Sequence, residues 1–269
     1  MKEKLLLGLP ELASEHGEMV DHMMLTVTYF MAFLGIFWAV FIAYAVVRFH
    51  QSKHPKASYK GMTSHWSSHL EIGVIITECI LLLGFAFPLW GTRVEDDRYP
   101  TGEDVVRVRA VGQKFEWTFH YPGADGEFGR VDPFLISAQN QLGLDPDDPN
   151  GHDDIQSKFD MYLPVGKNVV VDVTSKDVIH GLHLLPLRMQ QDAMPGSSSH
   201  IWFRPTKVSP EDGWDILCAQ LCGPGHANMA AKLYVTPEED FNAWLESSAP
   251  KAPAAPAGDV GASASTPGS

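Results

Sequence analysis

The stretch Cys218-Ala-Gln-Leu-Cys222-Gly-Pro-Gly-His226-Ala-Asn-Met229 brings two thiols, an imidazole and a thioether together in one short loop. Sulfur donors of this kind favour copper or zinc, and a methionine thioether favours copper. A mononuclear blue-copper site uses a single Cys, so the second thiol indicates a different arrangement. Two thiolates can bridge two copper ions, and each ion then needs an imidazole and a weaker ligand. The spacing therefore predicts a two-copper site that takes one more His from elsewhere in the chain.

The second imidazole is offered by the stretch Asp177-Val-Ile-His180-Gly-Leu-His183. We assign His180 to the metal and interpret His183 as a structural imidazole or one that supports a ligand. Two other chemistries remain open for the same loop. Cys218 and Cys222 can form a disulfide in an oxidising compartment, and two Cys with two His can hold a structural zinc ion.

Two apolar segments precede this part of the chain. Residues Met23 to Val47 carry no charge over more than the roughly 20 residues that a bilayer span needs. A second apolar run extends from Ile72 to Trp90 and is interrupted mainly by Thr77 and Glu78. The sequence therefore predicts a transmembrane hairpin over 23–92, with spans at about 23–48 and 70–91.

The charges around the two spans predict their orientation. The segment from Arg48 to Lys60 holds four basic residues and no acidic one, which places it in the cytoplasm by the positive-inside rule. The N-terminal segment 1–22 and the region that follows the second span, with acidic residues at 95–97, then lie outside. No secretory signal is evident in residues 1–10, and we expect the first span to remain in the mature protein.

The remainder of the chain has the pattern of a β domain, which we expect over 98–246. Short runs rich in β-branched residues alternate with Gly and Pro turns, as in a Greek-key β-sandwich. The clearest predicted strands are 105–111, 168–174 and 232–236. Residues 123–157 are rich in Asp, Asn and Gly and predict a solvent-exposed insertion. We predict a short helix over 238–245 and a flexible Ala/Pro/Ser tail over 247–269.

These motifs resemble subunit II of the haem-copper cytochrome c oxidases, whose dinuclear copper centre is called Cu-A. The resemblance extends from about Met23 to Trp244 and includes the stretch Gln191-Asp-Ala-Met-Pro-Gly196 between the first His and the Cys loop. It implies the cupredoxin version of the β-sandwich. It also implies that two Cys bridge the coppers and that two His, a Met and a backbone carbonyl complete the ligands, which are Cys218, Cys222, His180, His226, Met229 and Gln220.

The chain departs from the commonest family pattern at two positions. The family has an aromatic stretch after its first strand that begins with Trp, the site where electrons enter. Here Phe115 holds that position, so Phe115 and Trp117 are both candidates for the role. Many relatives have Glu in place of Gln220, and this Glu helps to bind magnesium at the boundary with subunit I. Because an amide is a weaker ligand for a hard cation, we expect this contribution to magnesium binding to be weak or missing.

The stretch His69-Leu-Glu71-Ile resembles the start of the family's second span. In the family, the Glu lies near the cytoplasmic entrance of a proton pathway that feeds subunit I, and the resemblance implies this role for Glu71. The alternative is a carboxylate that only marks the water interface.

The resemblance implies an electron-accepting subunit of a cytochrome c oxidase in a bacterial-type inner membrane, with the Cu-A domain on the periplasmic side. It takes electrons from cytochrome c, soluble or membrane-bound, and passes them to subunit I. That partner holds haem and a further copper, and with the other oxidase subunits it couples oxygen reduction to proton translocation. No nucleic acid is expected as a partner.

Composition agrees with this reading. The net charge of -13 suits a surface that attracts a basic electron donor, and the chain has no Cys-x-x-Cys-His motif for a haem of its own. Quinol oxidase subunit II lacks the copper ligands, and nitrous oxide reductase carries this centre on a soluble propeller enzyme. A membrane-tethered copper carrier remains the alternative from a different functional class.

Overall fold

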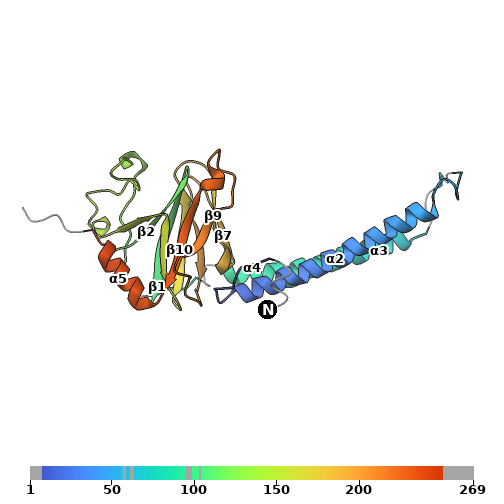
Figure 1. The fold of residues 1–269 in the computed structure, drawn as a ribbon, viewed down its shortest axis with the longest axis horizontal. Coiled ribbons are helices and arrows are strands. Elements are labelled where there is room, and N and C mark those ends of the chain that lie inside the picture. Colours follow the sequence, from blue (N-terminus) through green and yellow to red (C-terminus); the bar gives the residue numbers. More distant parts are fainter. Residues whose placement is uncertain (1–7, 57–58, 61–63, 95–98, 103, 251–269) are drawn as a thin grey trace, which may run out of the picture. The chain divides into compact units, whose positions relative to one another are not determined.

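The computed structural model describes residues 8–56, 59–60, 64–94, 99–102 and 104–250 (Figure 1). The predicted acidic residues 95–97, the first residues of the N-terminal segment and residues 251–269 of the predicted tail lie outside the described residues. The predicted fold of two apolar helices followed by an all-β sandwich is confirmed.

Two long helices are apolar enough to cross a membrane. The first is α2 (Gly17–Arg48), and the second runs continuously through α3 (Trp66–Leu81), the π-helical turn η1 (Leu82–Ala86) and α4 (Phe87–Val94). Their most apolar windows have mean hydropathies of 2.4 and 2.3. Both helices extend beyond the predicted spans into more polar flanking residues, among them Glu18 and Asp21 before the first span and Arg93 after the second.

The π-helical turn has a local cause in the sequence. Pro88 lacks an amide hydrogen and cannot donate the usual helical hydrogen bond to the carbonyl of Gly84. Widened turns of this kind often accompany such a break in the ladder of helical hydrogen bonds. The helix therefore continues past the proline to Val94.

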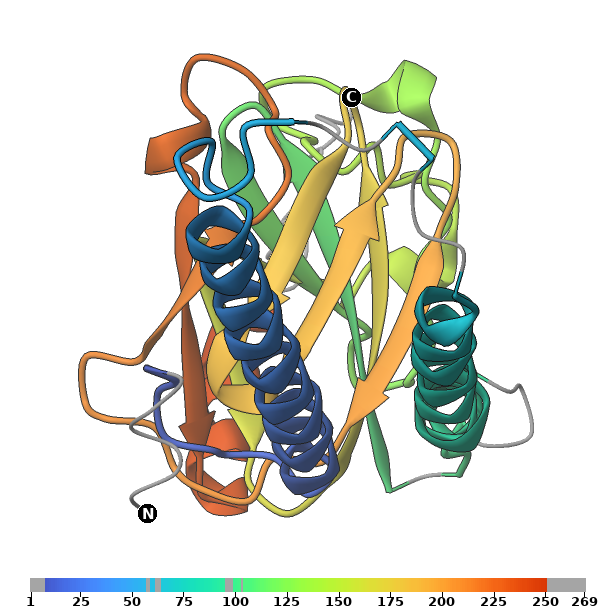
Figure 2. The same cartoon turned by 90° about the vertical axis from the view of Figure 1, so that its right-hand side faces the viewer.

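The β domain consists of two five-stranded sheets, whose strands can be followed in Figure 1 and, from another side, in Figure 2. The first sheet contains, in order, β3 (Ile155–Lys158), β2 (Glu116–Tyr121), β1 (Val105–Gln113), β5 (Asn168–Ser175) and β8 (Ser199–Phe203). The second contains, in order, β4 (Asp160–Pro164), β10 (Ala230–Thr236), β9 (Trp214–Cys218), β6 (His180–Leu184) and β7 (Met189–Ala193).

The core of the sandwich follows from the two-residue period of its strands. Val169, Val171 and Val173 of β5 are fully buried, and the residues between them face the other side of the sheet. In β6, Leu182 and Leu184 are also fully buried. Each such side chain contributes about 1.5–3 kcal/mol on burial, so a shift of register by one residue would expose the apolar face. This packing fixes the strand that begins with His180.

The predicted insertion 123–157 contains ordered turns. Its 3-10 turns η3 (Pro133–Leu135) and η4 (Pro149–Gly151) are each capped by the aspartate that precedes them. Leu142 is buried, and β3 begins inside the predicted insertion at Ile155. The segment is therefore not solvent-exposed throughout, because turns rich in Asp and Gly enclose a few apolar side chains. Residues 121–156 and 242–250 belong to a separate compact unit.

Candidate metal centre

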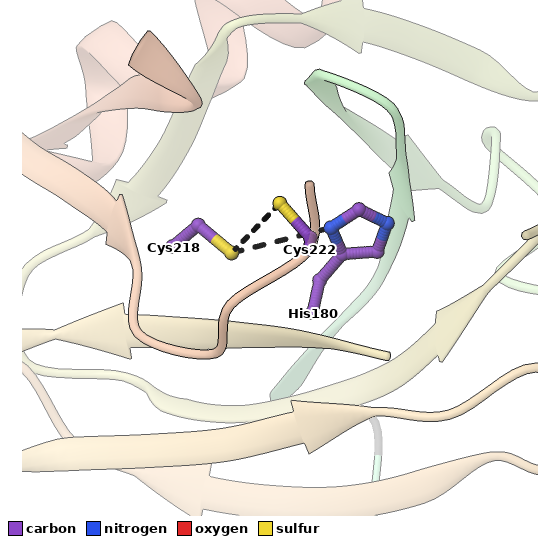
Figure 3. A group of neighbouring side chains, drawn as sticks. All are labelled: His180, Cys218 and Cys222. Atoms are coloured by element: carbon purple, nitrogen blue, oxygen red, sulfur yellow. Dashed lines mark hydrogen bonds between the residues drawn. The ribbon is translucent and has the colours of Figure 1, made fainter. Parts of the chain in front are cut away.

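Three side chains from two strands and one loop meet in the second sheet. His180 is the first residue of β6, Cys218 is the last residue of β9, and Cys222 lies in the loop that follows (Figure 3). The two sulfur atoms are 3.8 Å apart, and Cys218 Sγ is 4.0 Å from His180 Nδ1. One ligand atom from each of the three residues lies within 4.8 Å of the other two, and all three residues are buried. The arrangement can hold a metal ion.

The other three predicted ligands lie around the same two sulfur atoms. Cys222 Sγ is 3.6 Å from His226 Nδ1 and 3.8 Å from Met229 Sδ. Cys218 Sγ is 3.2 Å from the backbone carbonyl oxygen of Gln220. All six residues that the sequence singled out are thus close together in space, although their role as metal ligands stays a prediction.

Backbone contacts bring the Cys loop to the strand that carries His180. The amide of Ala219 donates to the carbonyl of Gly181 at 2.9 Å, and the amide of Cys218 donates to the carbonyl of Met229 at 3.1 Å. A Cβ at position 181 would lie 3.0 Å from the amide nitrogen of Gln220. Glycine at this position therefore allows the loop to approach β6 closely.

The chemistry of the donors fits copper. The site offers two thiols, two imidazoles, a thioether and a carbonyl oxygen, and the thioether favours copper over zinc. Cys218 and Cys222 are free thiols. Burial, together with the Cys218 thiol, raises the pKa of Cys222 to about 11. Binding of a metal ion at neutral pH would therefore release a proton from this thiol.

Asp177 supports His180 from behind. Its Oδ1 lies 2.8 Å from His180 Nε2, so the imidazole turns its Nδ1 toward the sulfur atoms. Burial opposes ionisation of Asp177, but hydrogen bonds from His180 and from the amides of Lys114 and Val178 lower its pKa overall. A carboxylate on the outer nitrogen fixes the ring and makes it a stronger ligand. Sequence reasoning missed this role, and the signal was an Asp three residues before the predicted ligand His180.

Trp117 lies directly behind the same imidazole. Its ring centroid is 6.0 Å from that of His180 in an edge-on arrangement, and the indole is fully buried. Gly112 of β1 makes this contact possible, because a Cβ there would come within 2.9 Å of His180 and 3.2 Å of Trp117. Sequence reasoning did not single out Gly112.

Phe115 packs against the loop between Cys222 and His226, called the metal loop below because it joins two predicted ligands. A Cβ at Gly225 would come within 2.4 Å of the Phe115 ring, and a Cβ at Gly223 would touch the same ring at 3.4 Å. Gly223 also has a φ of 133°, which favours glycine. Phe115 is only partly buried. The ring therefore covers the backbone between Cys222 and His226 while it remains accessible from outside.

The remaining predicted site residues lie apart from this cluster. His183 is on β6 and is not in the group of His180, Cys218 and Cys222. Burial lowers the pKa of His183. Glu71 is on α3, where it lines an apolar cleft of about 470 Å³ together with aromatic residues of α2, among them Phe37 and Trp38.

Comparisons with known proteins agree on one family. Residues 106–235 match the family described as cytochrome C oxidase subunit II, periplasmic domain. The chain is 36% identical over 214 residues to "Alternative cytochrome c oxidase subunit 2" of Bradyrhizobium diazoefficiens, covering 78% of this chain and 74% of the relative. It is 30% identical over 232 residues to cytochrome c oxidase subunit 2 of Cereibacter sphaeroides, covering 80% and 71%.

Among solved structures, the periplasmic domain of subunit II of the cytochrome oxidase of Bradyrhizobium japonicum is similar to this chain. The sequence identity is 27%, the TM-score is 0.38, and the match covers 55% of this chain and 95% of that domain.

Replacing Gly225 with Ala should weaken copper binding. The added methyl group would clash with the Phe115 ring and displace either that ring or the loop between Cys222 and His226. We expect copper affinity to fall about 10- to 100-fold, the range for losing a contact that supports a ligand. Competition with a copper chelator measures this. Gly35→Ala, at a glycine with open space around it, is the control, and equal affinities for the two variants would contradict the prediction.

Replacing Asp177 with Asn should also lower copper affinity, because the neutral amide leaves His180 a weaker ligand. We expect a loss of about tenfold in chelator competition. The matched control is Asp172→Asn, since Asp172 accepts a hydrogen bond from His200 at 2.7 Å and does not contact the metal cluster. Wild-type affinity in Asp177→Asn would show that the carboxylate does not support the ligand.

Proposed function

Because the chain belongs to the cytochrome c oxidase subunit II family, we propose that it is the electron-accepting subunit of a cytochrome c oxidase. In this role it takes electrons from cytochrome c at a two-copper Cu-A centre and delivers them to haem in subunit I, where oxygen reduction is coupled to proton translocation. The observation that carries the proposal is a cluster of two thiols, two imidazoles and a thioether. Each imidazole nitrogen and the thioether sulfur lie within 4.0 Å of a thiol sulfur, and the two thiol sulfurs lie within 4.0 Å of each other.

Copper bound at this site would supply one-electron redox chemistry, with the electron shared between two ions. The protein's part is to hold the ligands so that they move little when the charge changes. Hydrogen bonds from Ala219 to Gly181 and from His180 to Asp177 support such rigidity. The burial of both thiols limits the access of water to the sulfur atoms.

We assign electron uptake from cytochrome c to Phe115 in preference to Trp117. Trp117 is fully buried, so a partner protein cannot touch it directly. Phe115 is partly exposed and touches the metal loop at Gly223 and Gly225. Electrons that arrive at the Phe115 ring are therefore one contact away from the backbone that joins Cys222 to His226.

The charge distribution supports a basic donor. Residues 123–157 contain eight acidic residues and one basic residue, a balance of -7, while the whole chain carries -13. In the same segment Phe134 is 97% exposed at the tip of η3. An exposed apolar side chain in an acidic segment suits a cytochrome c with a basic rim, because opposite charges steer the encounter.

We propose that the exposed side of the Cys loop contacts subunit I. Leu221 lies between the two Cys and is 79% exposed, and the Gln220 side chain also faces outward. A neutral amide at position 220 makes only a weak magnesium ligand, so magnesium at this boundary depends on subunit I.

The two apolar helices and the periplasmic-domain family make this a membrane-anchored protein with an external domain. We propose a bacterial inner membrane, with the segment between the helices in the cytoplasm. Glu71 then lies near the cytoplasmic end of α3, in the cleft shared with α2, and we assign it to proton uptake for subunit I.

Replacing Cys218 or Cys222 with Ser should abolish cytochrome c oxidation by the assembled oxidase, because a hydroxyl cannot replace a bridging thiolate. Oxygen consumption with reduced cytochrome c measures the effect, and Cys79→Ser on α3 is the matched control.

Metal analysis and electron paramagnetic resonance of the wild-type protein test whether the site holds two coppers. Two coppers per chain with a shared electron are expected, whereas a single labile Cu(I) would support the membrane-tethered carrier instead.

Replacing Phe115 with Ala should slow electron uptake from cytochrome c about tenfold or more, since placement of the donor contact is lost. Copper content should stay at two ions per chain, because Phe115 is not a ligand. Stopped-flow reduction of the copper centre measures the rate. An unchanged rate would move the assignment to Trp117.

A further inference from the structure

The segment from Pro10 to Asp21 is bound to the β domain by its backbone. The amide of Ala13 donates to the carbonyl of Pro186 at 2.9 Å, and the carbonyl of Ala13 accepts from the amide of Thr206 at 2.8 Å. Ser14 forms an isolated antiparallel bridge with Pro205 and is buried. The chain therefore adds a short strand-like element to the domain immediately before α2 begins.

A buried ion pair joins the second turn of α2 to the same region. The Arg188 guanidinium donates from Nε to Asp21 Oδ1 at 2.7 Å and from a second nitrogen to Asp21 Oδ2 at 3.3 Å. It also donates to the carbonyls of Pro10 at 2.9 Å and Leu185 at 2.8 Å. The side chains of Arg188 and Asp21 are 2% and 5% exposed. Every nitrogen of the guanidinium thus has a partner, two of them in the N-terminal segment.

The backbone at Arg188 is in an unfavourable conformation. Its φ of 54° lies in the left-handed region, where glycine is the usual residue. Arg188 ends the 3-10 turn η5 (Leu185–Leu187), and its side chain leaves that turn toward Asp21. A strained arginine at a position suited to glycine indicates that the side chain has a specific task.

Gly17 shows how closely the start of α2 approaches the N-terminal segment and Arg188 of the β domain. A Cβ at this position would come within 2.2 Å of the Leu12 side chain, 2.8 Å of Ser14 Oγ and 3.0 Å of the Arg188 side chain. Only a residue without a side chain fits where the N-terminal segment, the first turn of α2 and Arg188 meet.

Stability alone is a weak reason for such a pair. Removing two charges from water is costly, and well-packed apolar residues often stabilise a fold as much or more. A bidentate ion pair does fix one geometry, because its hydrogen bonds are directional. The turn that carries Arg188 directly connects β6, which begins with the predicted ligand His180, to β7.

We propose that the Asp21–Arg188 pair is a clasp that fixes the copper-bearing β6–β7 edge to the external end of the first membrane-spanning helix. Asp21 and Arg188 are then positioning residues for electron delivery to the membrane partner. They act by holding the β domain at one distance and angle from the bilayer. This inference rests on the proposed function only for its consequence in electron transfer, and the clasp itself rests on the contacts above.

The test uses the assembled oxidase in membranes, with Arg188→Gly and Asp21→Asn as the main variants. Arg188→Gly removes the guanidinium and relieves the strained backbone, so the domain should still fold. The control is Glu15→Gln, which breaks the exposed pair between Glu15 and Arg204 at 3.6 Å in the same region. The double variant, Asp21→Asn with Arg188→Gly, tests whether the two residues act together.

Hydrogen exchange reports on the clasp without reference to copper. Each main variant should speed exchange of the Ala13 and Glu15 amides about tenfold or more, the loss expected when charged hydrogen bonds disappear. In the double variant, these two amides should exchange no faster than in the single variant with the larger effect. Wild-type exchange in Arg188→Gly would overturn the clasp.

Electron transfer reports on positioning. After rapid reduction of the copper centre, transfer to haem should slow about tenfold or more in both main variants and stay normal in Glu15→Gln. Copper content and the paramagnetic spectrum should remain those of the wild type, which separates displacement of the domain from damage to the site. Faster amide exchange with a normal transfer rate would overturn the positioning role. Absence of a two-copper signal in the wild type would instead refute the proposed function, while amide exchange would still decide the clasp.

Discussion

The structure depends on holding two thiols of one loop beside an imidazole of a neighbouring strand. Cys218 and Cys222 are separated by three residues, so the chain must turn sharply between them and still lie flat against β6. The backbone hydrogen bond from Ala219 to Gly181 makes this possible, and a side chain at position 181 would crowd the backbone of Ala219 and Gln220. The β-sandwich provides β6 and β9 as adjacent antiparallel strands, and this fixes where the loop begins.

Groups around the predicted ligands have separate tasks. Asp177 orients His180, the indole of Trp117 fills the space behind the imidazole, and Phe115 covers the loop from outside. Asp177 also accepts a hydrogen bond from the amide of Lys114, the residue before Phe115. The backbone beside the partly exposed aromatic ring and the predicted ligand His180 are therefore fixed to the same carboxylate. This coupling places the proposed site of electron uptake and the metal centre on one rigid framework.

The contacts at the N-terminus extend this framework to the membrane. A domain that exchanges electrons with a membrane partner needs a fixed position as well as a rigid site. The buried pair of Asp21 and Arg188 provides a directional connection where a flexible linker would leave the distance free to vary. The unusual backbone of Arg188 lies in the turn between β6 and β7, so the constraint reaches the strand of His180 through covalent structure.

The sequence by itself determined the two apolar helices, the all-β domain and the six residues gathered around the sulfur atoms, because uncharged runs, two-residue periods and ligand spacing are local patterns. It also identified Phe115 and Trp117 without separating them. Only the tertiary structure showed that Trp117 is buried behind His180 while Phe115 covers the loop, and that Asp177 and Gly112 support the site. The contact of Asp21 with Arg188 joins residues far apart in the chain, and no local pattern encodes it. Such contacts depend on which strands become neighbours, and that is decided by packing of the whole domain.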